Sequence, residues 1–241
     1  MRLRVDLIVT RGTPAARAAK NATESIPIVM AAIGEPLGMG VVASLARPGG
    51  NVTGLSAFVT ELAGKRVELV KELRPGHSIA AFFHNMGNPV VPPQWEETKK
   101  AAQTLGIEVT LLDVRTKDDI PAAFETATAR RVDTLLVGID GLMQENRQLI
   151  ADLAAKHRLP AIYPSREFVD VGGLMAYGVS YPDLYLRSAS LIDKIFRGAK
   201  PGDLPVEQPT KLEFIVNLKA ANALGLTVPP LLIARADEAI E

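Results

Sequence analysis

The sequence contains no cysteine, and this absence excludes several kinds of chemistry. Without cysteine there is no disulfide framework, no thiol nucleophile and no thiolate metal site. The three histidines, His77, His84 and His157, are scattered and lack a spacing typical of metal ligands. Neither a G-x-S-x-G nucleophile elbow nor a phosphate-binding P-loop is present. We therefore predict no metal, no cofactor and no enzymatic activity.

The chain also lacks an excess of charge of either sign and any long apolar run. Its 27 Lys and Arg residues balance its 27 Asp and Glu residues. We therefore expect no broad attraction to nucleic acid or to a membrane surface, and no nucleic-acid partner. No apolar run approaches the ~20 residues that a membrane span needs. No signal peptide is visible, because the first four residues lead directly into an apolar strand pattern.

The stretch from Val5 to Ala16 organises the rest of the chain. Its first residues form a short apolar run rich in β-branched side chains, which is typical of a buried strand. Gly12 ends the run, Thr13 is a good helix N-cap, and Pro14 suits the first helical turn. In parallel α/β sheets, ligands bind beyond the carboxyl ends of the strands, beside such helix starts. Taken alone, the stretch is an ordinary capped turn between a strand and a helix. The chain repeats this strand–turn–helix pattern, which favours a ligand site at these turns.

Strand patterns alternate with helix patterns along the whole chain, which predicts an α/β fold of parallel sheets flanked by helices. The pattern restarts after residues 55–60 and returns near 177–183, which predicts two lobes. We assign residues 1–57 and 178–241 to lobe 1, and residues 58–177 to lobe 2, with a ligand cleft between the lobes.

Two finer expectations concern lobe 1. We expect a helix from the turn at Gly34 and Pro36 to about Ala46. Residues 211–216 alternate apolar and polar side chains, which predicts an edge strand.

Short polar residues follow five of the expected strands: Thr13, Glu35, Asn85, Asp140 and Ser165. Each one alone is a plausible cap or turn residue. If the two lobes face each other, all five could line one binding cleft.

All four tyrosines lie in one stretch, and two of them, Tyr163 and Tyr177, are candidates for the walls of a ligand site. Their rings would supply flat apolar surface and their hydroxyl groups polar tips. The alternative is that these rings pack helices and a hinge. His84 ends an expected strand, and we favour a hydrogen-bonded structural role for it.

Four segments carry a family resemblance: VDLIVTRGTPAARAAK, IPIVMAAIGEPLGMGVVASLARPGGNVTGLS, LPAIYPSREFVDVGGLMAYGVSYPDLY and GAKPGDLPVEQPTKLEFIVNLKAANALGL. They resemble the ABC transporter substrate-binding proteins, a family that includes tryptophan- and tyrosine-type binding proteins. The resemblance implies a type I periplasmic-binding-protein fold of two lobes that close on a solute. It also implies a membrane permease as partner and a periplasmic or membrane-anchored location. By position, Thr13, Glu35, Asp140 and Tyr177 fall where such proteins place ligand contacts.

The leading hypothesis is therefore the solute-binding component of a bacterial ABC importer. Its small-molecule solute would bear a carboxylate, as an amino acid or an aromatic acid does. The first alternative is the ligand-sensing core of a transcription regulator, which shares this fold but would need a helix-turn-helix segment. The second alternative is an α/β enzyme, because sequence does not exclude a nucleophile and a base that meet only in space.

The start of the chain departs from the resembling family, whose members have an export signal and about two further strand–helix units before this first strand. The resemblance thus implies that lobe 1 is incomplete. We expect an unpaired strand edge or an uncovered apolar patch there, and such surfaces favour association with another chain.

Overall fold

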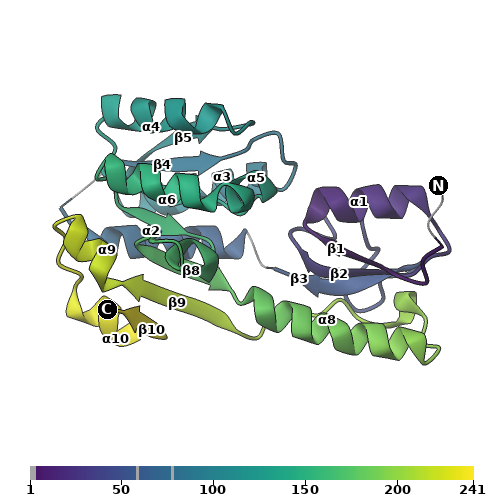
Figure 1. Cartoon of the computed structure of the whole chain (residues 1–241). Coiled ribbons are helices and arrows are strands. Elements are labelled where there is room, and N and C mark those ends of the chain that lie inside the picture. Colours follow the sequence, from purple (N-terminus) through teal and green to yellow (C-terminus); the bar gives the residue numbers. More distant parts are fainter. Residues whose placement is uncertain (1–3, 58–59, 77–78) are drawn as a thin grey trace. The chain divides into compact units, whose positions relative to one another are not determined.

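The computed structural model describes residues 4–57, 60–76 and 79–241, and the chain forms two compact units (Figure 1). Unit 1 comprises Met1–Val59 and Val179–Lys211, whereas unit 2 comprises Thr60–Gly178 and Leu212–Glu241. The predicted division needs one correction, because residues 212–241 belong to unit 2 and not with the chain start. The reason is that these residues add strands to the sheet of unit 2.

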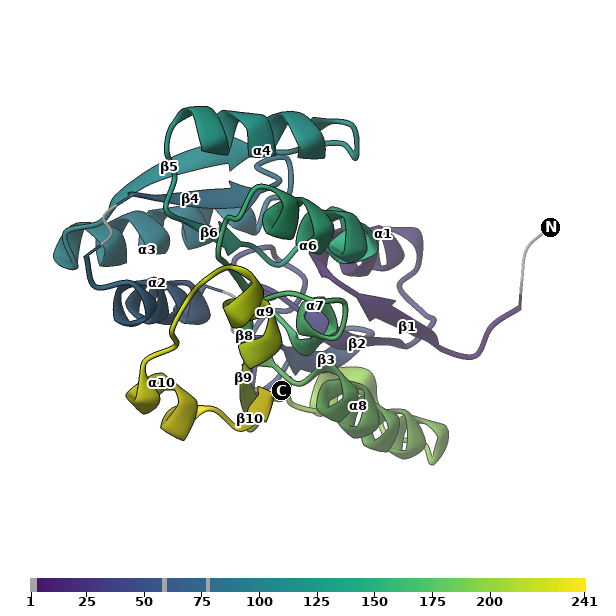
Figure 2. The ribbon, with the colours of Figure 1, turned by 60° about the vertical axis from the view of Figure 1, so that its left-hand side comes forward.

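Unit 1 is built on a three-stranded parallel sheet in the order β1-β2-β3. Its elements are β1 (Ile8–Arg11), α1 (Thr13–Ala22), β2 (Ile28–Ile33), β3 (Val52–Ser56), α8 (Tyr181–Phe196) and the 3-10 turn η1 (Pro201–Asp203). Helices α1 and α8 cover opposite faces of this sheet (Figures 1 and 2). The central strand β2 is buried along its whole length, as its apolar sequence requires.

The outer edge of β1 is open, because among the described residues this strand pairs with β2 alone. Val9 of β1 is 47% exposed, and Leu186 and Phe196 of α8 are also exposed. The expected open edge and uncovered apolar side chains are therefore both present in unit 1. Whether the chain associates through them stays a prediction, which light scattering in solution would test.

Unit 2 contains a seven-stranded sheet in the order β10-β9-β8-β7-β6-β4-β5. The strands from β4 to β8 pair in parallel, as do β9 and β10. The strands are β4 (Ile79–His84), β5 (Glu108–Asp113), β6 (Thr134–Val137), β7 (Ala161–Tyr163), β8 (Met175–Val179), β9 (Leu212–Asn217) and β10 (Glu238–Ile240). The helices are α2 (Glu61–Leu73), α3 (Val91–Thr104), α4 (Asp119–Ala129), α5 (Gly141–Glu145), α6 (Arg147–Lys156), α7 (Arg166–Val169), α9 (Leu218–Ala223) and α10 (Pro230–Arg235). No helix in the described ranges combines the length and the apolar character that crossing a membrane would require.

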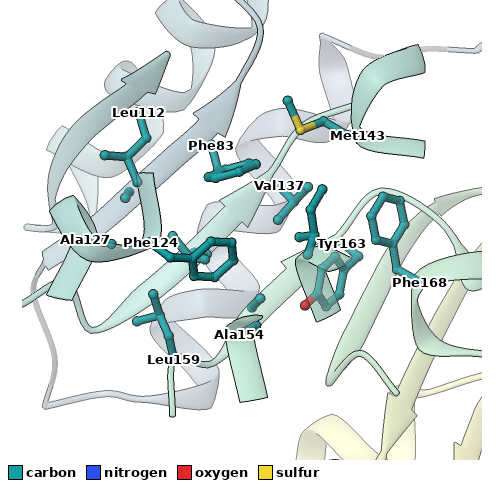
Figure 3. Close-up of a cluster of buried hydrophobic side chains, with 14 of the residues drawn as sticks. Phe83, Leu112, Phe124, Ala127, Val137, Met143, Ala154, Leu159, Tyr163 and Phe168 are labelled. Carbon is teal, nitrogen blue, oxygen red and sulfur yellow. The ribbon is translucent and has the colours of Figure 1, made fainter. Parts of the chain in front are cut away.

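The core of unit 2 lies between the sheet and the helices α4, α6 and α7 (Figure 3). Phe83 of β4 and Phe124 of α4 pack with ring centroids 5.5 Å apart. Tyr163 of β7 stacks on Phe168 of α7 at 4.9 Å. Helices α2 and α3 pack side by side on the other face of the sheet (Figure 2). The sheet is thereby buried on both faces, which explains its near-continuous apolar strands.

Two finer expectations differ from the structure. The segment after Glu35 is a series of tight turns and bends, not a helix, because Gly40 takes a left-handed φ of 63°, which interrupts a right-handed helix. Strand β9 is not an edge strand, because β10 pairs along its outer side. The short strand β10 lies in the tail, where the sequence pattern had indicated no element.

Candidate functional site

The carboxyl ends of β4 and β6 bring a set of polar side chains together in unit 2. Because these strands are parallel neighbours, their ends meet at the same edge of the sheet. Asp140 follows β6 and is the N-cap of α5, with Oδ1 accepting a hydrogen bond from the backbone N–H of Leu142 at 2.8 Å. Its Oδ2 accepts a hydrogen bond from the Asn88 side chain, also at 2.8 Å. Asp140 is therefore held rigidly by two donors, and its oxygens keep further lone pairs for a ligand.

Asn85 begins the loop after β4, and its side chain shapes that loop. Its Oδ1 accepts a hydrogen bond from the backbone N–H of Gly87 at 2.9 Å, which forms an Asx-type turn. The turn leads to Asn88, the residue that bonds Asp140. Asn85 thus supports the local structure of this edge, and direct contact with a ligand stays a prediction.

His84, the last residue of β4, is completely buried beneath this edge. Its Nδ1 accepts a hydrogen bond from the backbone N–H of Asn85 at 2.8 Å, so the neutral ring carries its hydrogen on Nε2. The pKa of His84 is lowered to about 4, chiefly by burial; the Asp140 carboxylate opposes this shift and the Arg66 cation adds to it. These contacts agree with the structural role predicted for His84. His77 lies outside the described residues.

We expect the stability of the protein to fall as the pH drops from about 6.5 towards 4, because of His84. In the unfolded chain this residue binds a proton near its ordinary pKa of 6.5, whereas the folded protein keeps it neutral down to about 4. The unfolded state thus binds more protons in this window, so the stabilisation is present above it and lost within it. The loss is about 1.4 kcal/mol per pH unit at its steepest.

Urea unfolding at several pH values measures this slope. A His84→Gln variant should lose the fall of stability that His84 causes between pH 6.5 and 4. The matched variant His157→Gln should keep it. Equal slopes in all three proteins would show that His84 titrates normally.

Arg66 is a buried residue of α2 that sequence reasoning missed, and it is only 3% exposed. Its Nε donates a hydrogen bond to the backbone carbonyl of Tyr177 in β8 at 2.8 Å. The signal was available, because Arg66 shares the apolar face of its helix with Leu62 and Leu73 at helical spacing. A charged residue on such a face indicates a specific partner or a function. Here it places a positive charge near the end of β8.

Ser165 and the two candidate tyrosines have different surroundings. Ser165 is buried after β7, and its Oγ has no hydrogen-bond partner among the described residues. Tyr177 is half-buried, with its ring edge-on to Phe214 at 6.2 Å.

The prediction that Tyr163 lines a ligand site needs a correction. Its ring is 1% exposed within the apolar core, and burial raises the pKa of its hydroxyl. Strand β7 directs this side chain towards the core, which its position at the end of the strand did not reveal.

Unit 1 brings Thr13 and Glu35 to neighbouring strand ends. The Thr13 hydroxyl donates a hydrogen bond to the backbone carbonyl of Gly34 at 2.8 Å and thereby ties the two turns together. This bond uses the hydroxyl hydrogen, so the groups left for a ligand are the oxygen lone pair and the N–H groups at the start of α1. Glu35 has a positive φ of 48°, which is uncommon for a residue other than glycine, and which Arg131 and Arg158 share just after α4 and α6.

The structure thus holds two polar strand ends, one in each unit, and neither has the features of a metal centre. Among residues 4–57, 60–76 and 79–241, no group of three or more metal-ligating His, Asp or Glu side chains occurs. The arrangement suits non-covalent recognition of a small polar molecule, with carboxylates, amides and helix N–H groups as the available partners.

Comparison with known proteins identifies the family. The model of the ABC transporter substrate-binding protein family matches residues 2–240. The chain belongs to this family. It is 30% identical over 236 residues to a curated tyrosine-binding protein of Clostridioides difficile, covering 97% of this chain and 68% of that protein. The family predicted from the sequence motifs is therefore confirmed.

Solved structures confirm the fold of this substrate-binding protein as the type I periplasmic-binding-protein fold. An ABC domain from Streptococcus pneumonia, solved in complex with L-Trp, matches with 31% identity and a TM-score of 0.89, covering 98% of this chain and 81% of that one. A conserved domain protein from Vibrio cholerae matches with 28% identity and a TM-score of 0.90, covering 98% of this chain and 79% of that one. A LacI family regulator from Bifidobacterium animalis, covering 87% of this chain and 76% of that one at a TM-score of 0.62, is only 14% identical and shows the fold alone. The regulator alternative is therefore the less supported one.

Proposed function

We propose that this substrate-binding protein captures an aromatic amino acid for an ABC importer. The family match over residues 2–240 carries the proposal, together with relatives that bind tyrosine and L-Trp. Binding would be non-covalent, so the protein would act as a carrier and not as an enzyme. Its partners would be the amino acid and a membrane permease, and its location would be periplasmic or membrane-anchored outside the cytoplasm.

The chemistry of the strand ends supports an amino acid as ligand. An amino acid presents a carboxylate and an ammonium group, which need partners of opposite charge. The N–H groups at the start of α1 and the positive charge of Arg66 suit the carboxylate. Asp140 and Glu35 are the candidate partners of the ammonium group. Tyr177 is the candidate aromatic contact for the side chain, and Tyr163 leaves this set because it is in the core.

Isothermal titration calorimetry with L-tryptophan and L-tyrosine tests this proposal. We expect saturable binding of at least one of them, and much weaker binding of the D-enantiomers. With the carboxylate and the ammonium group both held, the two hands direct the side chain differently, and only one can place it in its own contact. A non-aromatic amino acid such as L-glutamate serves as the control for side-chain selectivity. If no aromatic amino acid binds but a sugar does, the proposed ligand class is wrong.

A further inference from the structure

Ser165 carries a buried hydroxyl group that the fold leaves unused. The residue follows β7 and is 2% exposed, and its Oγ has no hydrogen-bond partner among the residues that the structure describes. Most buried polar side-chain atoms in proteins have a partner, because an unpaired one loses its bonds to water and gains none in return. The Ser165 hydroxyl therefore adds nothing to the stability of the fold, which makes it a candidate for binding a ligand.

The local structure does not account for this hydroxyl. Ser165 is the N-cap of α7, where a serine normally accepts a hydrogen bond from a backbone N–H of the first turn, but no such side-chain bond is formed. The same sheet contains a second buried hydroxyl without a hydrogen-bond partner in the described part of the chain, that of Thr134 at the start of β6. Of these two hydroxyls, only that of Ser165 lies at the carboxyl edge of the sheet, the edge that also carries Asp140.

Ser165 lies inside the row of strand-end residues that we propose as the amino-acid site. Strand β7 pairs in parallel with β6 on one side and with β8 on the other, so the end of β7 lies between the ends of those two strands. Asp140 follows β6, and Tyr177 lies near the end of β8. Ligands of parallel sheets bind at these strand ends. The unused hydroxyl is therefore at the edge where a ligand is expected.

A positive charge lies beside the loop that carries Ser165. The Nε atom of Arg66 donates a hydrogen bond to the backbone carbonyl of Tyr177 at 2.8 Å. A Cβ atom at Gly178 would lie 1.8 Å from the carbonyl oxygen of Pro164 and 3.5 Å from Nη2 of Arg66. The guanidinium group and the residue before Ser165 thus approach the same point, and a side chain at position 178 would prevent this approach.

The nearby charge decides which group of an amino acid fits this loop. A serine hydroxyl can donate to a carboxylate or accept from an ammonium group. Glu167, whose Oε2 is also buried with no hydrogen-bond partner among the described residues, would favour the ammonium group. The guanidinium group of Arg66 favours the carboxylate, and it is the charge that lies beside the loop at Gly178. The geometry therefore favours a carboxylate.

We propose that Ser165 is a carboxylate-binding residue of the amino-acid site, where its hydroxyl donates a hydrogen bond to the ligand carboxylate beside the positive charge of Arg66. This inference rests on the proposed function, and it assigns the carboxylate to the ends of β7 and β8 and not to the start of α1. Shielding from water strengthens a hydrogen bond to a charged group, so a buried hydroxyl suits this task.

Replacement of Ser165 with alanine separates binding from stability. We expect L-tryptophan or L-tyrosine to bind about 10- to 100-fold more weakly in calorimetry, because a hydrogen bond to a charged group is lost. The urea midpoint should stay the same or rise, since the hydroxyl has no partner to lose, whereas loss of a capping serine would lower it. Thr134→Val is the matched control, because it removes the other unpartnered hydroxyl of the sheet and should leave the affinity unchanged.

Two ligand analogues test the assignment to the carboxylate. Tryptamine lacks this group, so Ser165→Ala should not weaken its binding, whereas 3-(indol-3-yl)propionate keeps the group and should be weakened as L-tryptophan is. If the wild-type protein binds no aromatic amino acid, the proposed function is wrong and the assignment falls with it. If the wild-type protein and Ser165→Ala bind equally well, the assignment alone is wrong. Equal weakening of tryptamine and L-tryptophan would also overturn it, because Ser165 would then act on the ammonium group or through the loop.

Discussion

Replacement of Gly138 with alanine is expected to destabilise the protein by at least about 3 kcal/mol, because it forces an atom into the space of a buried ring. The new Cβ would lie 1.6 Å from Cδ2 and 2.1 Å from Nε2 of His84. His84 has no exposed surface into which its ring could move, and it packs against Phe82 with ring centroids 5.2 Å apart. The change would disturb the edge that also carries Asp140.

Gly141→Ala is the matched control, only three residues away. No atom lies within 4 Å of a Cβ built there, and alanine favours the helix that begins at this residue. Urea unfolding followed by the fluorescence of Trp95 measures both variants, since Trp95 stacks on Phe82 at 5.5 Å. Combining Gly138→Ala with His84→Ala should restore part of the lost stability, because the clash disappears. If Gly138→Ala and Gly141→Ala were equally stable, the placement of the His84 ring would be wrong.

Replacement of Asp140 with asparagine is expected to weaken the binding of an aromatic amino acid by about 10- to 100-fold. The change removes the negative charge that we assign to the ammonium group, and a hydrogen bond to a charged group contributes about 1.5–3 kcal/mol. Asparagine caps helices as well as aspartate does, so Oδ1 can still accept from Leu142. Its amide nitrogen replaces Oδ2, the acceptor of the Asn88 bond, so we expect a loss of stability of about 1 kcal/mol. Calorimetry measures the affinity, and urea unfolding the stability.

Ligand analogues separate a direct charge contact from a structural effect. 3-(Indol-3-yl)propionate has the carboxylate and ring of tryptophan but no ammonium group, so Asp140→Asn should not weaken its binding. Glu35→Gln is the parallel variant in unit 1 and decides between the two candidate carboxylates. If Asp140→Asn weakens the amino acid and the analogue equally, Asp140 acts through the loop that it holds with Asn88, and not on the ammonium group.

Local pattern predicted the elements of this protein well wherever a segment's own residues decide its conformation. The apolar β-branched run before Gly12 supplies Ile8 and Val9 of β1, and the Thr13–Pro14 pair opens α1. The strand is not buried as expected, because its outer edge is open and Val9 is 47% exposed. The same logic failed after Glu35, where a helix was expected but Gly40 takes a positive φ. A left-handed glycine interrupts a right-handed helix whatever its neighbours favour.

The sequence by itself determined the family, the alternation of strands and helices, and the polar residues at the strand ends, because these depend on local order along the chain. Only the tertiary structure decided which of those residues come together. The bond from Asn88 to Asp140 joins residues 52 apart, and burial of the Tyr163 ring depends on α7 packing over β7. It also assigned residues 212–241 to unit 2, since strand pairing is a long-range contact that no local pattern encodes.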